Sequence, residues 1–235
     1  MRLLSKGMRP LSNLACRTAT AALEQASADA RSMPGNLLPH ERLDDLTGAA
    51  KRIVAEVERL PEAPYDLSGA ADHPIDATVV GLLAGRRLDL PADGLLELGI
   101  GLFLQDIGML ALPPAIVDNP GPLDEAELEL MRRHPQHGLD LLREEDAGAG
   151  ARAVIRYHHE RWDGAGYPYG LAGEEIPLFA RIAALAHAFA ATTSQPAAVD
   201  TLRAGSGLAF DPHLVEVFED VAMARSPGLR TVAAA

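Results

Sequence analysis

The sequence predicts an all-α protein, and three observations support this. Apolar residues recur at helical spacing in several segments, Pro, Gly and Asp residues stand at the ends of those segments, and no convincing run of alternating apolar and polar residues indicates a strand. Hydrophobic residues make up 48% of the 235 residues and aromatic residues only 4%, so Leu, Ala, Val and Ile have to form most of the core. The length suits one domain with an appendage.

The N-terminal third is expected to contain two helices. Residues 11–32 have helical composition and end at a Pro-Gly-Asn break, and a second helix runs from about Glu41 to Leu60. A loop rich in Pro, Gly and Asp follows, and we place a domain boundary near residue 66. We therefore expect residues 1–66 to form an N-terminal helical extension without a recognised sensor domain, and residues 67–235 to form the main domain.

Short helices separated by Pro and Gly loops are expected in the main domain. The helix over 92–107 is nearly all apolar, which is typical of a central core helix. Asp124 and Glu127 form a capping-box pattern, and Asp211 with Pro212 is a strong helix-start signal. The other helices are expected over about 74–87, 137–144, 148–159, 178–193, 197–204 and 211–224.

Charge and cysteine content exclude several classes of protein. The net charge of −12 argues against binding to a nucleic-acid polymer, so an anionic ligand would need local cations, either metal ions or placed Arg and Lys side chains. Cys16 is the single cysteine, which excludes an internal disulfide framework. The N-terminus lacks the apolar run of a signal peptide, and we find no apolar stretch of about 18 residues. These features predict a cytoplasmic protein without a membrane span.

Histidines carry the strongest chemical signal in the sequence. Of the eight, the adjacent pair His158 and His159 stands where a helix gives way to a Gly-rich loop, a position that suits metal ligands or two surface histidines at a helix C-terminus equally well. Asp106 follows a mostly apolar helix and is either a ligand or a solvated residue past the helix end. His134 precedes a proline, where a cap or surface role is more common than ligation.

Glycines and prolines between Trp162 and Pro177 indicate a loop with one specific backbone path, in which Tyr167 offers a hydroxyl. Arg181 lies one turn into the helix that follows. It can reach a phosphate held near the loop, although pairing with Glu174 or Glu175 at the surface is the more common role for such a residue.

Long motifs resemble the HD-GYP family, a branch of the HD metal hydrolases. The match is carried by HHERWDGAGYPYGLAGEEIPLFARI over 158–182, by QDIGMLALPPAIVDNPGPLDEAELELMRRHPQHG upstream and by AGSGLAFDPHLVEVF downstream. It extends from about His73 to Glu219 and leaves residues 1–66 uncovered. The resemblance implies an HD-type helical bundle that opens cyclic di-GMP at its phosphodiester bonds with two, sometimes three, divalent metals, of which iron and manganese are the expected ions.

The resemblance also assigns roles to individual positions. The first metal would be held by the early histidine, the HD pair and a late position. The second would be held by the bridging aspartate, Asp106, which is also the expected catalytic residue, and by the later histidines. The family's GYP triplet is matched by Gly166, Tyr167 and Pro168, and Arg181 matches a basic residue that contacts ligand. The complete expected metal set is His73, Gln105, Asp106, His134, His158, His159 and His187.

Departures from the family pattern are concentrated at the first metal. Gln105 replaces the histidine of the HD pair, His187 replaces the late aspartate, and Met109 replaces a lysine. A glutamine carbonyl is a weak ligand for a transition metal, and loss of one member of a catalytic unit can cost several orders of magnitude in rate. The sequence therefore predicts one or two bound ions with a degraded first site.

Three functions remain open, and of these the full GYP loop argues against a metal phosphohydrolase with a different substrate, such as a nucleotide. The first is ligand sensing or protein docking in cyclic di-GMP signalling, with weak or absent catalysis. The alternative is an active cyclic di-GMP phosphodiesterase with a rebuilt binuclear site. The implied partners are cyclic di-GMP or a related cyclic dinucleotide, a diguanylate cyclase or other signalling protein, and a second copy of the chain in a homodimer.

Overall fold

The computed structural model describes residues 21–22, 24–26, 28–29, 40–59, 73–142, 147–192 and 195–223. Every regular element in these residues is a helix, and the only β-type contacts among them are isolated bridges between Asp163 and Ala172 and between Ser206 and Phe210. The all-α prediction is confirmed. Of the helix expected over 11–32, the described residues are helical, and the rest of that segment lies outside the described residues.

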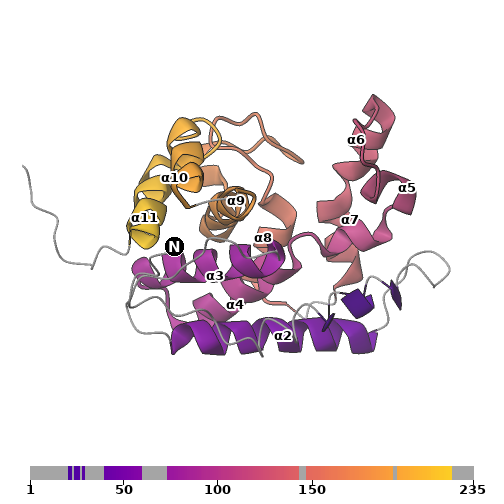
Figure 1. Ribbon diagram of the computed structural model, residues 1–235, viewed down its shortest axis with the longest axis horizontal. Coiled ribbons are helices and arrows are strands. Elements are labelled where there is room, and N and C mark those ends of the chain that lie inside the picture. The colour runs from indigo at the N-terminus through magenta and orange to yellow at the C-terminus, as the bar shows by residue number, and fades with distance from the viewer. Residues whose placement is uncertain are drawn as a thin grey trace, which may run out of the picture.

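Three helices form the base of the bundle: α2 (His40–Glu58), α3 (His73–Arg87) and α4 (Ala92–Leu104). Figure 1 shows α2 running along one side of the molecule, with α3 and α4 between it and the later helices. Most of α4 is buried, as expected for a nearly all-apolar helix, because it contacts both α2 and α8 (Ala149–Tyr157). Leu43, Leu46 and Ile53 of α2 belong to the same core cluster as Ile100 and Phe103 of α4.

A second core cluster lies where α3 meets α9 (Leu178–Ala190), α10 (Gln195–Ala204) and α11 (Pro212–Ala222). The start of α11 follows its predicted signal, since the Asp211 carboxylate accepts a hydrogen bond from the backbone N–H of His213 at 2.9 Å and Pro212 opens the helix. Both clusters are built mainly from aliphatic side chains, in agreement with the low aromatic content.

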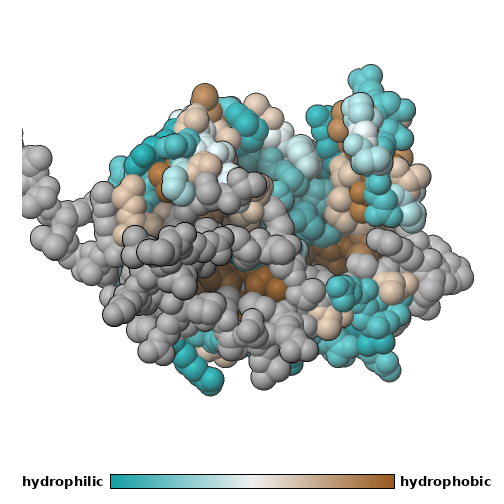
Figure 2. Space-filling view, viewed as in Figure 1, coloured by the Kyte–Doolittle hydropathy of each residue, from teal (hydrophilic) through white to brown (hydrophobic). Residues whose placement is uncertain are grey.

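An arm projects from the other end of the bundle, made of α5 (Pro114–Val117), α6 (Glu125–Met131) and α7 (His134–Leu141). No residue of α6 is buried, and Figure 2 shows a mostly hydrophilic surface at the tip of this arm. The predicted capping box is present: the Asp124 carboxylate accepts from the N–H of Glu127 at 2.8 Å, and the Glu127 carboxylate accepts from the N–H of Asp124 at 2.9 Å.

Some predicted helix boundaries differ from the structure, and one short helix was not predicted. The apolar helix ends at Leu104 rather than residue 107, and a 3₁₀ helix, η2 (Ile107–Ala111), follows it. Helix α7 begins at His134 rather than residue 137, because Pro135 occupies one of its first positions, where a missing N–H costs nothing. The short helix α5 was not predicted, since four residues give no periodic pattern.

As expected, no run of about 18 apolar residues is present, since Asp93, Glu97 and Asp106 interrupt the most apolar helical segment, although that segment reaches membrane-spanning length and hydropathy. Residues Ala92–Ala111 are long and apolar enough to cross a bilayer. In the bundle, however, 61% of the most apolar window of this segment is buried by the rest of the protein, because α4 is a central core helix.

The N-terminal region contributes directly to the main bundle, since α2 packs against α3 and α4. The boundary predicted near residue 66 lies outside the described residues.

Candidate metal centre

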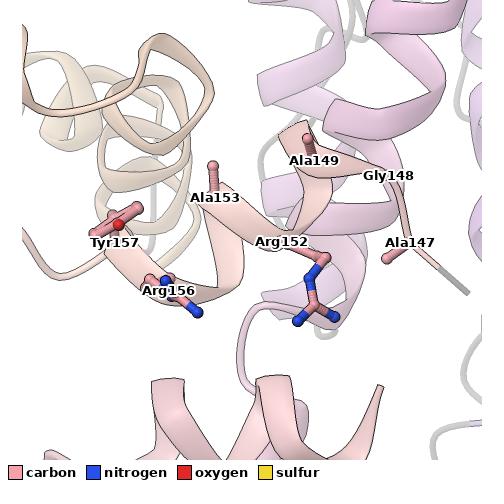
Figure 3. Close-up of a pocket in the computed structure, with 7 residues that line it drawn as sticks. All are labelled: Ala147, Gly148, Ala149, Arg152, Ala153, Arg156 and Tyr157. Carbon is pink, nitrogen blue, oxygen red and sulfur yellow. The ribbon is translucent and has the colours of Figure 1, made fainter. Parts of the chain in front are cut away.

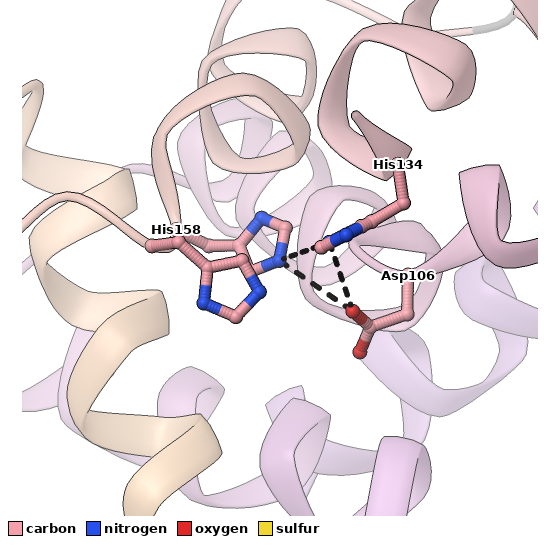
Figure 4. Close-up of side chains that lie close together, drawn as sticks. Asp106, His134 and His158 are labelled. Carbon is pink, nitrogen blue, oxygen red and sulfur yellow. Dashed lines mark hydrogen bonds and ion pairs between the residues drawn. The ribbon is translucent and has the colours of Figure 1, made fainter. Parts of the chain in front are cut away.

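Four predicted ligands converge from three parts of the bundle. Asp106 stands between α4 and η2, His134 opens α7, and His158 and His159 directly follow α8. One ligand atom from each of the four lies within 4.8 Å of the others. Figure 4 shows Asp106, His134 and His158 directed toward a common point. Residues separated by up to 53 positions in the sequence thus form one cluster.

The spacing of three of these atoms suits a metal ion. Nε2 of His134 lies 3.2 Å from Nε2 of His158, and each of these nitrogens lies 3.5 Å from Oδ1 of Asp106. Ligands about 2.1 Å from a tetrahedral metal ion are separated from one another by about 3.4 Å. The triangle therefore has the size of one face of a metal coordination shell.

Hydrogen bonds on the far side of both imidazoles fix which nitrogen can ligate. Nδ1 of His134 lies 2.8 Å from the carbonyl oxygen of Met131, and Nδ1 of His158 lies 3.1 Å from the carbonyl oxygens of Val154 and Ile155. A carbonyl only accepts, so each Nδ1 carries the proton and donates, and each neutral ring directs the lone pair of Nε2 inward. Two lone pairs facing each other beside a carboxylate are unfavourable unless a cation lies between them.

Titration of the cluster favours the same ligand-ready state. The pKa of His134 lies below its usual value, mainly because the ring is buried and secondly because of the charge of His158. Burial and the charges of His158 and His134 lower the pKa of His159 to about 2. For Asp106, burial acts to raise the pKa, but hydrogen bonding to His158 and the nearby histidine charges outweigh it, so this pKa lies well below its usual value. These shifts favour a neutral imidazole at His134 and His159 and an ionised carboxylate at Asp106 near neutral pH.

Close backbone packing holds Asp106 against α7. Gly108 sits in η2, and a Cβ atom there would overlap the carbonyl oxygen of His134 and come within 2.5 Å of the Gly138 nitrogen. Only glycine allows this approach. Helix α7 and η2 accordingly pack face to face and place His134 beside Asp106.

Two of the residues expected at the first metal form a hydrogen bond with each other instead of converging as ligand atoms. Gln105 is 1% exposed, and its Nε2 lies 3.2 Å from Nδ1 of His187. That same Nδ1 lies 4.0 Å from Oδ2 of Asp106. The amide oxygen of Gln105 is buried, and no residue that the structure describes donates a hydrogen bond to it. The structure thus brings Gln105 and His187 together beside Asp106, but joins them by a hydrogen bond. Helix α3 begins at His73, whose side chain lies outside the described residues.

The predicted ligand loop lies against the cluster. The Tyr167 ring stacks on His159 with 4.6 Å between ring centroids and 17° between planes. The pKa of the Tyr167 hydroxyl lies above its usual value, mainly because the group is buried and secondly because of the charge of Asp106, so the hydroxyl stays protonated. The Tyr167–Pro168 peptide bond is cis, and a Cβ at Gly166 would collide with the backbone of Glu160 and Arg161.

Glu160 holds this loop in place, a role that residue-by-residue reasoning missed. Its side chain is buried, and its two carboxylate oxygens accept hydrogen bonds from the N–H of Tyr169 at 2.7 Å and of Leu171 at 3.0 Å. A carboxylate that directly follows the histidine pair and precedes a Gly-rich loop was the available signal. Such a buried anion is stable because backbone donors satisfy it.

Arg181 has a partner other than the one expected at the surface. Its Nη1 donates to Oδ2 of Asp211 at 2.8 Å, and its guanidinium carbon lies 5.8 Å from the centroid of the Trp162 ring. Neither Glu174 nor Glu175 is its partner. The Arg181–Asp211 pair ties α9 to the start of α11 and offsets the arginine's charge.

The surface interpretations of His134 and His158 are wrong, because both side chains are almost fully buried. Sequence position alone did not reveal this, since a histidine before a proline and a histidine at a helix end are usually solvated.

A separate pocket of about 440 Å³ opens beside α8 (Figure 3), and the residues that line it are Ala147, Gly148, Ala149, Arg152, Ala153, Arg156 and Tyr157.

Comparison with known sequences places the fold and the site in context. The sequence model of the HD domain family matches residues 40–214. A cyclic di-GMP phosphodiesterase of Pseudomonas aeruginosa is 35% identical over 189 residues, covering 77% of this chain and 44% of the relative. The cyclic di-GMP phosphodiesterase response regulator RpfG of Xanthomonas campestris is 39% identical over 150 residues, covering 59% of this chain and 39% of the relative.

A third relative, a 3′3′-cGAMP-specific phosphodiesterase of Vibrio cholerae, is 35% identical over 48% of this chain and 24% of its own length. The chain therefore spans less than half the length of these curated relatives. Among solved structures, an HDG"Y"P protein from Bdellovibrio bacteriovorus aligns with a TM-score of 0.66 at 16% identity, covering 95% of this chain and 75% of that one. This likeness shows the shared fold.

Proposed function

Because the chain belongs to the HD domain family, and within it to the HD-GYP group, we propose that it acts in cyclic dinucleotide signalling as a ligand-sensing or protein-docking module with weak or absent catalysis. The observation that carries this proposal is the contrast between the two metal positions. The second offers three converging ligand atoms, whereas the first contains a glutamine hydrogen-bonded to a histidine.

The second position suits a divalent transition metal. Neutral imidazoles with one carboxylate form a donor set typical of iron and manganese, and the Nδ1–H groups of His134 and His158 are already engaged by backbone carbonyls. We expect Asp106, His134, His158 and His159 to hold one ion there. When bound, such an ion polarises phosphoryl oxygens and activates water.

The first position is poorly suited to a second ion. Nδ1 of His187 is the nitrogen that approaches Asp106. The same Nδ1 is hydrogen-bonded to the Gln105 amide, whether the amide nitrogen donates to it or the amide oxygen accepts from it, so it is not free to bind a metal. A glutamine oxygen is in addition a weak ligand for these metals. We therefore expect His73, Gln105 and His187 to bind a second ion weakly, which limits any hydrolysis that requires two metals.

The ligand class follows from the relatives. The relatives described above are named for action on cyclic di-GMP or on 3′3′-cGAMP, and we propose a cyclic dinucleotide as the ligand, with cyclic di-GMP as the first candidate. We expect Gly166, Tyr167 and Pro168 to line its binding site, with Arg181 as a further contact. A diguanylate cyclase or other signalling protein and a second copy of the chain are the proposed docking partners, in the cytoplasm.

An active phosphodiesterase with a rebuilt binuclear site is the second candidate. The observation in its favour is that His187 keeps a ring nitrogen 4.0 Å from Oδ2 of Asp106. Displacement of Gln105 from that nitrogen would free it for coordination.

Metal content and hydrolysis measured on the same purified sample distinguish these functions. We expect about one ion per chain by elemental analysis, binding of cyclic di-GMP, and little or no linear product when manganese or iron is added. Two ions per chain with sustained turnover would show instead that Gln105 and His187 support a working binuclear centre.

A further inference from the structure

A phosphodiester ligand needs positive charge near the metal centre of this acidic protein. The chain carries a net charge of −12, and Met109 stands where the resemblance leads us to expect a lysine. Arg181 is a candidate cation, but its charge is offset by Asp211 at 2.8 Å. Arg161 is likewise paired, with Asp163 at 2.6 Å. A cation without a carboxylate partner would interact more strongly with a phosphate than either of these.

Arg132 has this property. It is exposed, and no ion pair or side-chain hydrogen bond joins it to any residue that the structure describes. It follows α6 and stands two residues before His134, so the turn that delivers a metal ligand also delivers this guanidinium.

The ring of Tyr167 connects Arg132 to the metal centre. The guanidinium carbon of Arg132 lies 5.8 Å from the centroid of that ring, a distance typical of cation–π contacts. The same ring stacks on His159 with centroids 4.6 Å apart. The arm and the Gly-rich loop therefore meet beside the cluster, with a positive charge held over an aromatic surface.

We propose that Arg132 binds a phosphate of the cyclic dinucleotide and that Tyr167 positions the guanidinium for this contact. The inference rests on the proposed function, since it assigns a binding residue to the same site. A planar guanidinium presents paired N–H donors that match phosphate oxygens, and contact with an aromatic face leaves those donors at the ring edge available. The ligand's charge would then be shared between the metal ion and Arg132.

A matched arginine is available as a control. Arg156 lies 5.9 Å from the centroid of the Tyr157 ring and lines the separate pocket beside α8 (Figure 3). Arg132→Gln and Arg156→Gln remove the same charge and the same type of aromatic contact, one beside the metal centre and one elsewhere. Arg132→Lys keeps the charge but loses the planar donor set.

The experiment is calorimetric titration of cyclic di-GMP into the manganese-loaded full chain. We expect Arg132→Gln to weaken binding about tenfold or more, because a hydrogen-bonded charge pair is lost, and to reduce its dependence on salt. Arg132→Lys should recover part of the affinity, and Arg156→Gln should bind within about twofold of wild type. Unchanged metal content and melting temperature in Arg132→Gln would show that the fold and the centre are intact.

Equal affinity of wild type and Arg132→Gln would overturn the assignment of Arg132. If the wild-type protein binds no cyclic di-GMP, the proposed function fails, and titration with inorganic phosphate then tests Arg132 independently. Weaker phosphate binding by Arg132→Gln than by Arg156→Gln supports an anion contact at Arg132, whereas equal binding by the two variants rejects it.

Discussion

At the scale of single residues, the metal centre depends on which nitrogen of each histidine carries the proton. His134 and His158 donate Nδ1–H to backbone carbonyls and turn Nε2 toward Asp106. His187 uses Nδ1 to hydrogen-bond Gln105. Residue type is therefore an incomplete guide to ligation, because the partner on the opposite side of the ring decides which histidine is ready to bind a metal.

Restoring the family residues at the first position tests this difference. In the double variant Gln105→His/His187→Asp, an imidazole and a carboxylate replace the hydrogen-bonded pair, so we expect metal content to rise from about one to about two ions per chain. Elemental analysis and a cyclic di-GMP hydrolysis assay measure the outcome. His213→Asp, a change at an exposed histidine of α11, is the control and should leave both unchanged. No gain of metal in the double variant would argue against our account of the first site.

A second prediction at the residue scale concerns Glu160. Glu160→Ala removes the acceptor of two backbone N–H groups in the ligand loop, which should destabilise the fold by about 1.5–3 kcal/mol and speed hydrogen exchange at Tyr169 and Leu171. Denaturant unfolding and exchange measured by NMR report these effects. Glu174→Ala, at an exposed position of the same loop region, should change neither by much. Unaltered exchange in Glu160→Ala would show that the loop keeps its path without the carboxylate.

At the scale of secondary structure, the site lies where helices end. Asp106 follows the end of α4, His134 begins α7, and His158 follows α8. Backbone that leaves a helix lets neighbouring side chains point in nearly the same direction, which a regular helix does not allow for adjacent residues. His158 and His159 can both face the centre for this reason, with 4.2 Å between their ring centroids.

The contact between η2 and α7 is the most sensitive of these junctions. Gly108→Ala would drive a methyl group into the backbone of His134 and Gly138, so we expect the two elements to separate and metal binding to fall at least tenfold. Metal titration with a competing chelator measures this loss. Gly121→Ala is the matched control, because its nearest contact would be the Asn119 side chain at 3.4 Å. Wild-type affinity in Gly108→Ala would mean that the junction can relax without moving the ligands.

At the scale of the whole molecule, the proposed metal ligands come from segments far apart in the sequence and are brought together by one bundle. Helix α4 contacts α2, α3 and α8, and α8 in turn contacts α7 and α9. An ion bound at the proposed centre would therefore link the projecting arm to the core, and we expect folding and metal binding to be coupled.

Thermal stability should follow metal concentration. With free manganese at about one hundred times the dissociation constant, the folded state gains about 2.7 kcal/mol, which raises the melting temperature of the protein. Calorimetry with and without a chelator measures the shift. His134→Ala should abolish it, while His213→Ala should retain it. A manganese-dependent shift that persists in His134→Ala would place the ion elsewhere.

The sequence by itself determined the all-α class, the central place of the apolar helix predicted over 92–107, the caps at Asp124 and Asp211, and the family resemblance. These features are local, since periodicity and capping depend on neighbours a few residues away. The family resemblance had already assigned Asp106, His134 and His158 to one metal, and the tertiary structure supplied the distances and buried hydrogen bonds of that cluster. Only the tertiary structure decided that Gln105 hydrogen-bonds His187 and that Arg181 is held by Asp211. Those contacts join distant segments, and no local pattern encodes which distant partner a side chain meets.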